Sequence, residues 1–177
     1  NLDDLNDKGT DLFSQMMDDY FQKVRSHDGP SIVAFHGTVS DAALDNGYIP
    51  RQNGIHLNLA RLTTLGCPVV GGHYHRCQEV GGPGTNVWYS GSLTRQTYGE
   101  SEGDKGVLLF EYEDGAWKQP EFISLNPTRM VLIEGDFNEL GWEISHNEPL
   151  FDLLPESFTG VKVRFRYKVK QHLVSAI

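Results

Sequence analysis

The sequence predicts a mixed α/β (α+β) protein, and three features carry this prediction. One strongly amphipathic helical segment lies near the start of the chain, over residues 10–27. Two short apolar stretches, "SIVAFH" and "CPVV", are typical of buried strands, and histidines follow closely on both. Further along, strand-like runs separated by Gly- and Asp-containing turns indicate antiparallel sheet.

The composition is that of an ordinary globular protein, with 38% hydrophobic and 22% charged residues in a chain of 177. No apolar run has the length of a membrane span, and no signal peptide is recognisable. The formal net charge of −9 argues against binding nucleic acid through overall charge, so such a contact requires a local basic patch or cations. Cys67 and Cys77 do not make a disulfide framework, which favours a cytoplasmic protein.

The first helix carries two adjacent apolar rows. We expect Thr10 to be its N-cap and the sequence "DGP" to end it. Because the two rows together are as wide as a core face, we expect both of them to pack against the sheet. The rows consist of Leu12, Met16, Tyr20 and Val24, and of Phe13, Met17 and Phe21.

The next elements place histidines at strand ends. "SIVAFH" ends at His36, a loop follows, and "NLARLTTLG" predicts a short helix capped by Asn58 and closed by Gly66. "CPVV" is then a second strand, and "GGHYH" is the loop that leaves it, with His73 and His75. In α/β sheets, ligand-binding and catalytic groups collect at the carboxyl ends of the strands.

The rest of the chain divides at about residue 126. The runs "RCQEV", "NVWYS", "GVLLFEYE" and "AWKQPEFISL" predict an antiparallel meander. After it, "RMVLIE", a small helix around "EPLFDLLPE" and the strand "VKVRFRYKVK" predict a separate α+β unit. The predicted domains are therefore residues 1–125 and residues 126–177.

Three histidines at equivalent strand ends suggest a metal site. A single histidine is more often a hydrogen-bonded core or loop residue, but His36, His73 and His75 together exceed what a structural role needs. Neutral imidazole suits Mn, Zn and Fe. Three imidazoles do not neutralise a pair of divalent cations, and no carboxylate lies in an obviously matching position.

Three stretches of the chain, "HGTVSDAAL", "VVGGHYHR" and "VWYSGSLTRQTYGESEGDKGVLLFEY", resemble the calcineurin-like metallophosphoesterases. Within that superfamily they are most similar to the SbcD-type DNA double-strand-break repair exonucleases. The residues that point to this subfamily are the run Gly91–Arg95, followed by Glu100 and then by Lys105 and Gly106. The similarity covers about Ser31 to Leu125, and more loosely the rest.

The resemblance implies part of a β-sandwich flanked by helices, followed by the start of a small α+β cap domain. It further implies hydrolysis of DNA phosphodiesters at a site with two divalent metal ions, Mn²⁺ or alternatively Mg²⁺. By position, His36 and His73 would ligate one metal and His75 the other, with Gly71 and Gly72 allowing a tight turn. The implied partners are DNA, an SbcC-like coiled-coil ATPase subunit and a second copy of the chain.

The departures from the family pattern are as informative as the match. The family motifs D-x-H, G-D-x-x-D and G-N-H precede the position of His36, and none is present in the 35 residues before it. We therefore expect a fragment: the C-terminal half of the phosphoesterase domain and the beginning of the cap, with no catalytic residue beyond the metal ligands and no activity alone. Two alternatives are a non-catalytic binding or scaffold module derived from a phosphoesterase, and a phosphoesterase acting on nucleotides.

A row of positive charges marks the predicted last strand. In "VKVRFRYKVK" apolar residues alternate with cations, so one face of the strand is basic. Such a face is often only a solvated edge. In a chain of net charge −9 it is also a candidate for contacts with a phosphate backbone. The DNA-binding candidates are Arg95, Lys162, Arg164, Arg166 and Lys168.

Overall fold

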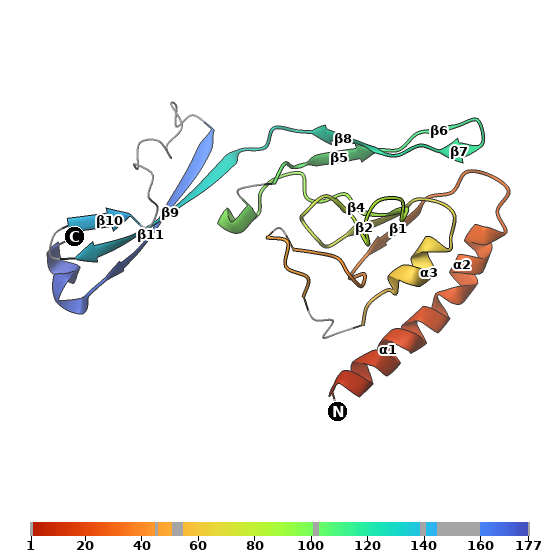
Figure 1. The fold of residues 1–177 in the computed structure, drawn as a ribbon, viewed down its shortest axis with the longest axis horizontal. Helices are drawn as coiled ribbons and strands as arrows, with labels where there is room; N and C mark the ends of the chain where they lie inside the picture. Colours follow the sequence, from red (N-terminus) through yellow and green to blue (C-terminus); the bar gives the residue numbers. More distant parts are fainter. Residues whose placement is uncertain are drawn as a thin grey trace. The chain divides into compact units, whose positions relative to one another are not determined.

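The computed structural model describes residues 2–44, 46–50, 55–100, 103–138, 141–144 and 160–176. The described part combines helices with several small sheets, which confirms the mixed α+β class (Figure 1). The chain divides into two compact units, one of Asn1–Leu93 and Gly103–Asn126, the other of Thr94–Glu102 and Pro127–Ile177. This division runs close to the boundary proposed from sequence, except that residues 94–102 belong with the second unit. The identity of the two predicted domains stays a prediction.

The first unit is organised by a four-stranded sheet. Its strands are β1 (Val33–His36), β2 (Val69–Gly72), β4 (Val87–Tyr89) and β3 (Gln78–Glu79), in that spatial order. β1, β2 and β4 run parallel, and only β3 is antiparallel to its neighbour. The predicted antiparallel pairing is present between β3 in "RCQEV" and β4 in "NVWYS". The prediction of one continuous meander was wrong, because β4 also pairs in parallel with β2. The alternation of buried and half-buried residues in β4 is the same for either strand direction, so the pattern does not reveal the partner.

Two helices in line, α1 (Leu2–Met16) and α2 (Asp18–Arg25), and the short α3 (Leu59–Thr63) accompany this sheet (Figure 1). The prediction of Thr10 as the N-cap was wrong, because α1 begins at Leu2 and Thr10 lies buried inside it. Its hydroxyl oxygen accepts a hydrogen bond from the backbone N–H of His56 at 3.3 Å. A threonine is tolerated in a helix interior when its hydroxyl has a partner of this kind.

Only one of the two apolar rows of this helical segment faces the core. Phe21 is buried, and Phe13 and Met17 pack against the same cluster. Leu12, Met16 and Tyr20 of the adjacent row are exposed, contrary to prediction, because a helix packed on one side buries only the stripe that faces its partner. Val24, the last member of that row, packs against the cluster. The exposed fractions are 60% for Leu12, 67% for Met16 and 61% for Tyr20.

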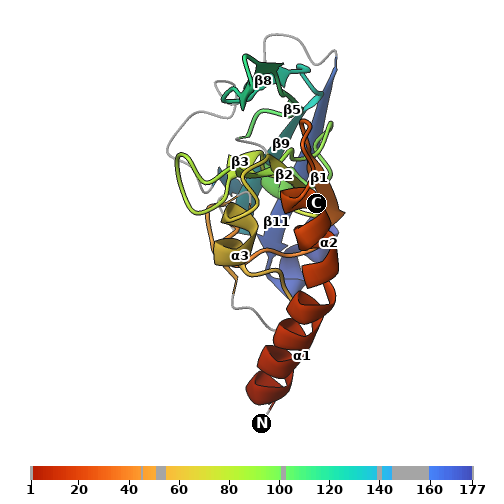
Figure 2. The same cartoon turned by 90° about the vertical axis from the view of Figure 1, so that its right-hand side faces the viewer.

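A long antiparallel ribbon completes the first unit. β5 (Gly106–Leu109) pairs with β8 (Glu121–Ser124), and the ribbon ends in the hairpin of β6 (Tyr112–Glu113) and β7 (Ala116–Trp117). Positive φ angles at both turn residues of this hairpin, 53° at Asp114 and 83° at Gly115, suit a two-residue connection. The ribbon lies across from the four-stranded sheet (Figures 1 and 2). The finer expectation of a phosphoesterase β-sandwich stays a prediction.

The second unit is built on the long strand β9 (Arg129–Asn138), between β10 (Gly141–Ile144) and β11 (Val161–Val169). β10 is antiparallel and β11 parallel to β9. Two 3₁₀ helices, η1 (Tyr98–Glu100) and η2 (Gln171–Ala176), accompany this sheet. The small helix predicted around "EPLFDLLPE" falls outside the described residues. None of the helices among the described residues has the length and apolarity required to cross a membrane.

Candidate functional site

The parallel pairing of β1 and β2 brings two of the predicted ligands together. His36 is the last residue of β1 and pairs with Gly72, the last residue of β2, so that His73 follows directly beside it. The two imidazole rings have centroids 5.7 Å apart and planes at 71°. Both side chains are exposed, so the pair is open to a ligand from solvent.

The glycines before His73 act differently from prediction. They lie within β2 and leave space for side chains, whereas the turn itself occurs one residue later. A Cβ atom on Gly72 would lie 2.9 Å from Nδ1 of His36, so the absence of a side chain lets that imidazole lie over the strand end. His73 itself adopts φ 122°, a conformation that costs a residue with a side chain free energy and that is concentrated at functional sites.

A tyrosine hydroxyl fixes the loop that follows His36. The Tyr89 side chain is fully buried, and its hydroxyl donates to the carbonyl oxygen of Gly37 at 2.6 Å and accepts from the backbone N–H of Val39 at 2.9 Å. Burial raises the pKa of Tyr89 well above its usual value, with the hydrogen bond from Val39 opposing this and nearby Tyr74 adding to it. The hydroxyl therefore stays protonated and keeps its donor role. The sequence patterns did not single out this residue.

Aromatic contacts continue from this hydroxyl to His73. The ring of Tyr74 is buried and meets the ring of Tyr89 edge-on, with centroids 4.9 Å apart. On its other side it meets the His73 ring, at 5.4 Å and an angle of 90°. Burial raises the pKa of Tyr74, and a hydrogen bond with Thr38 opposes that shift. His73 and the loop after His36 are thus held by the same pair of buried tyrosines.

His75 is held through its backbone. Its carbonyl oxygen accepts a hydrogen bond from Nζ of Lys105 at 2.8 Å and another from the backbone N–H of Ser92 at 3.1 Å. Its side chain is exposed. Across the described residues, however, no three His, Cys, Asp or Glu side chains form a group that could hold a metal ion, so His75 does not complete a set with His36 and His73. The chain supplies a two-imidazole portion of a site, which suits a metal ion only if further ligands join it.

Arg95, predicted to contact DNA, is engaged inside the second unit. Its guanidinium donates to the backbone carbonyl oxygens of Glu100, Pro127 and Thr128, at 3.1, 3.0 and 3.3 Å. Glu100 is buried and accepts hydrogen bonds from the backbone N–H groups of Gln96 and Thr97. These contacts fasten residues 95–100 to the start of β9 and give Arg95 a structural role that the sequence did not reveal.

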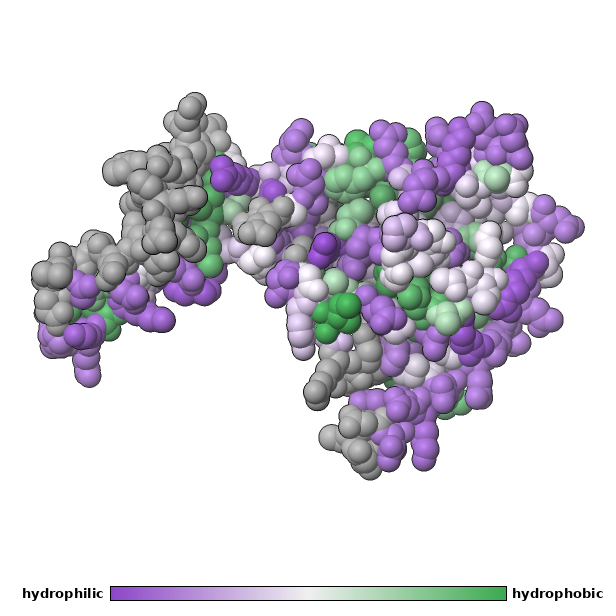
Figure 3. Space-filling model, viewed as in Figure 1, coloured by the Kyte–Doolittle hydropathy of each residue, from purple (hydrophilic) through white to green (hydrophobic). Residues whose placement is uncertain are grey.

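The predicted basic face is present on β11. Lys162, Arg164, Arg166 and Lys168 are all exposed on this strand. On the face drawn in Figure 3, both hydrophilic and hydrophobic residues appear in the β9 and β11 region. Two of the cations have partners within the second unit. Arg166 forms an ion pair with Glu134 at 2.8 Å, and the guanidinium of Arg164 lies 4.2 Å from the ring centroid of Tyr98.

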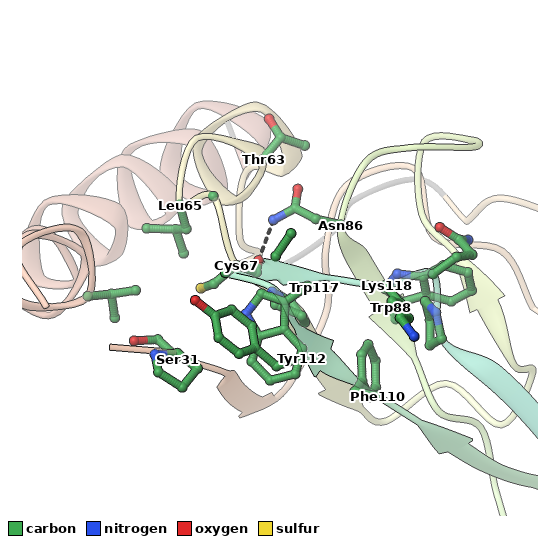
Figure 4. Close-up of a pocket in the computed structure, with 18 of the residues that line it drawn as sticks. Ser31, Thr63, Leu65, Cys67, Asn86, Trp88, Phe110, Tyr112, Trp117 and Lys118 are labelled. Carbon is green, nitrogen blue, oxygen red and sulfur yellow. Dashed lines mark hydrogen bonds between the residues drawn. The ribbon is translucent and has the colours of Figure 1, made fainter. Parts of the chain in front are cut away.

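A pocket of about 650 Å³ lies elsewhere in the first unit, at the amino-terminal ends of the parallel strands (Figure 4). None of the three predicted histidine ligands lines it. Its charged groups are satisfied within the chain: Lys118 pairs with Glu111 and Glu113, and Arg25 donates to the Thr64 hydroxyl. The pocket therefore does not single out a class of ligand. Its aromatic lining consists of Trp88, Phe110, Tyr112 and Trp117.

No protein-family model and no curated protein matches this chain.

Proposed function

We propose that the chain is part of a metal-dependent DNA nuclease of the SbcD type, comprising the C-terminal half of its calcineurin-like phosphoesterase domain and the beginning of its cap domain. The observation that carries the proposal is the pairing of His36 and His73 at the ends of adjacent parallel strands, 5.7 Å apart. The strained backbone of His73 supports it, because such strain persists where the surrounding structure holds it for a function.

The sheet of the first unit also supports the proposal that the other half of the phosphoesterase domain lies upstream of this chain. Parallel sheets are normally covered on both faces. β1 is the edge strand of the described sheet, and its outer face is open: Ile32 is 49% exposed, and Ala34 is exposed as well. In this proposal the upstream half of the domain packs against that edge and face. It also brings the carboxylates that a pair of divalent cations requires.

In the full-length protein, His36 and His73 would hold one divalent cation and His75 would contribute to the second, with Mn²⁺ favoured over Mg²⁺ by the imidazole ligands. When bound, the two ions supply charge stabilisation for phosphodiester hydrolysis. The residues of this chain contribute by orientation. The space left by Gly72 admits the His36 ring, and the Tyr89 hydroxyl fixes the loop behind it.

The proposed partners are DNA, an SbcC-like coiled-coil ATPase subunit and a second copy of the chain. The β11 cations support the contact with DNA, since rows of this kind bind phosphate backbones. The exposed row on α1 and α2 supports a homodimer, because it presents apolar side chains at helical spacing to solvent. The exposed members of that row are Leu12, Met16 and Tyr20, and Leu5 on α1 is exposed as well.

The test compares this chain with the same chain joined to its upstream sequence. We expect the 177-residue chain to show little or no cleavage of linear duplex DNA with Mn²⁺, and the longer protein to cleave in a chelator-sensitive way. In the longer protein, His75→Ala is expected to abolish cleavage. The control is His27→Ala, which should leave cleavage intact, because His27 lines the pocket at the amino-terminal ends of the strands.

Robust, chelator-sensitive cleavage by the 177-residue chain would show that the missing ligands were misjudged. An upstream sequence without the D-x-H and G-N-H motifs, together with DNA binding but no cleavage, would instead favour the non-catalytic module. The absence of a three-ligand group among the described residues fits that alternative as well as the proposed half-site.

A further inference from the structure

A lysine sits in the interior of the first unit next to the histidine loop. Lys105 immediately precedes β5 and is only 1% exposed. Its own carbonyl oxygen accepts a hydrogen bond from the N–H of Leu125 at 2.9 Å, so its backbone is fixed where the β5–β8 ribbon begins. Burying an ammonium group is unfavourable unless hydrogen bonds compensate, and a methionine of similar length would fill the same space without that cost.

The ammonium group reaches the backbone of the candidate site. Nζ of Lys105 lies 2.8 Å from the carbonyl oxygen of His75, a residue 30 positions earlier in the chain. The N–H of Ser92 donates to the same oxygen. Gly91 brings this segment close: it has φ 78°, and a Cβ atom there would lie 2.9 Å from the backbone nitrogen of Cys77 and 3.0 Å from the His75 oxygen.

Two donors on one carbonyl oxygen restrict the orientation of the peptide group that follows His75. The direction of the Cα–Cβ bond is tied to that orientation, so the position of the imidazole depends on both donors. The Ser92 donor belongs to the backbone that continues from β4, whereas the Lys105 donor is a side chain supplied by the ribbon. Lys105 therefore links the ribbon to the loop that carries His73 and His75.

We propose that Lys105 is a positioning residue that sets the direction of the His75 imidazole toward the metal site. This rests on the proposed function for its purpose, but the positioning itself is measurable without metal. Lys105 touches neither substrate nor cation. It acts through the carbonyl oxygen of His75, as outer-shell partners of metal ligands do.

The first experiment uses the 177-residue chain without metal. NMR spectra of the histidine ring C–H groups and hydrogen exchange of the Ser92 amide are compared among wild type, Lys105→Met and Lys105→Arg. We expect Lys105→Met to shift the His75 ring signals and to speed exchange at Ser92. The arginine variant, which keeps the charge and the N–H donors, is expected to restore both, and the ring signals of His27 should not move in either variant.

Unchanged His75 signals in folded Lys105→Met would overturn the proposal, as would equal shifts at His27, which indicate a general loosening. If Lys105→Met does not fold, Lys105→Gln gives the same readout. It keeps an N–H donor on a shorter side chain, so it is expected to shift the His75 signals in the same direction as the methionine variant, but by less.

The second experiment uses the chain joined to its upstream half, with Mn²⁺ and duplex DNA. Lys105→Met is expected to lower kcat about 10–100-fold, the range typical of outer-shell partners, while KM for DNA is unchanged, and Lys105→Arg recovers most of the activity. A rise in KM alone would assign Lys105 to substrate binding and contradict the positioning role. If the joined protein has no activity at all, the proposed function fails, while the NMR result still decides the positioning of His75.

Discussion

Removing one oxygen atom tests how the loop behind His36 is held. Tyr89→Phe deletes the hydroxyl and keeps the ring, which packs edge-on against Phe35 and Tyr74 with centroids 5.8 and 4.9 Å away. The substitution removes the 2.6 Å hydrogen bond to the Gly37 carbonyl and the 2.9 Å hydrogen bond from the Val39 N–H. The packing of the ring is left in place.

The magnitude follows from the burial of the groups left behind. Val39 is 0% exposed, so its N–H has no access to water once the hydroxyl is gone. Leaving such a donor unsatisfied costs about 1–3 kcal/mol, whereas the half-buried Gly37 carbonyl is closer to solvent and adds less. For a unit of this size, roughly 4 °C of melting temperature corresponds to each kcal/mol. Tyr89→Phe is therefore expected to lower the melting temperature by about 4–12 °C.

The measurement is thermal and urea unfolding followed by near-UV circular dichroism. Tyr20→Phe is the matched control, because its ring is 61% exposed and a surface change of this kind stays within about 0.5 kcal/mol. If Tyr89→Phe is as stable as the control, the hydroxyl does not hold the loop and the reasoning from its two hydrogen bonds is wrong.

The same variant has a distinct pH dependence. Because burial raises the pKa of Tyr89 above 10.0, the folded chain keeps this proton at pH values where the unfolded chain loses it. The resulting stability is fully present below about pH 10 and is lost as the pH rises toward the folded pKa. The advantage of wild type over Tyr89→Phe should therefore shrink above about pH 10, by about 1.4 kcal/mol per pH unit. An advantage that stays constant up to about pH 11 would contradict this.

Two further predictions concern the histidine loop and the basic strand. His73→Gly should be more stable than His73→Ala by about 1 kcal/mol in urea unfolding. Both substitutions remove the ring, but only glycine adopts φ 122° without strain. Equal stability of the two variants would mean that the backbone of His73 is not strained. In the full-length protein, replacing three β11 cations by glutamine should weaken DNA binding and reduce the salt slope by roughly one unit for each cation that binds a phosphate. An unchanged slope would assign the row to solubility. The substituted residues are Arg164, Arg166 and Lys168, and the charge-matched control replaces Lys8, Lys23 and Arg25.

Sequence patterns located the histidines but not the groups that hold them. Apolar runs ending at His36 and shortly before His73 were enough to place both at one sheet edge, because parallel strands end together. The Tyr89 hydroxyl and the Lys105 ammonium reach partners 50 or 52 and 30 residues away, and no local periodicity encodes contacts at such separations. The alternation around Tyr89 indicated only which residues share a face.

In the helical segment, the sequence pattern predicted the apolar rows but not which of their residues are buried. Its spacing predicted which residues form apolar rows, and one row does pack on the sheet through Phe13, Met17 and Phe21. The width of the stripe was read as the width of a core face, yet the extent of a core depends on the sheet that the helix meets. Leu12 and Met16 remain at the surface, whereas Val24 of the same row packs against the core.

The conformation of His73 links the folding of this edge to its proposed role. A φ of 122° in a non-glycine residue costs about 1–3 kcal/mol, and glycine at this position would avoid the cost. One contact of the His73 ring offsets part of this cost: the Tyr74 ring meets it edge-on at 5.4 Å, a contact worth about 0.5–1.5 kcal/mol. His73 has a strained backbone and a ring in contact with a buried tyrosine, and the His36 ring beside it has room because Gly72 lacks a Cβ atom. Packing alone does not require this arrangement. The arrangement supports the proposed role of His36 and His73 as two ligands of one cation.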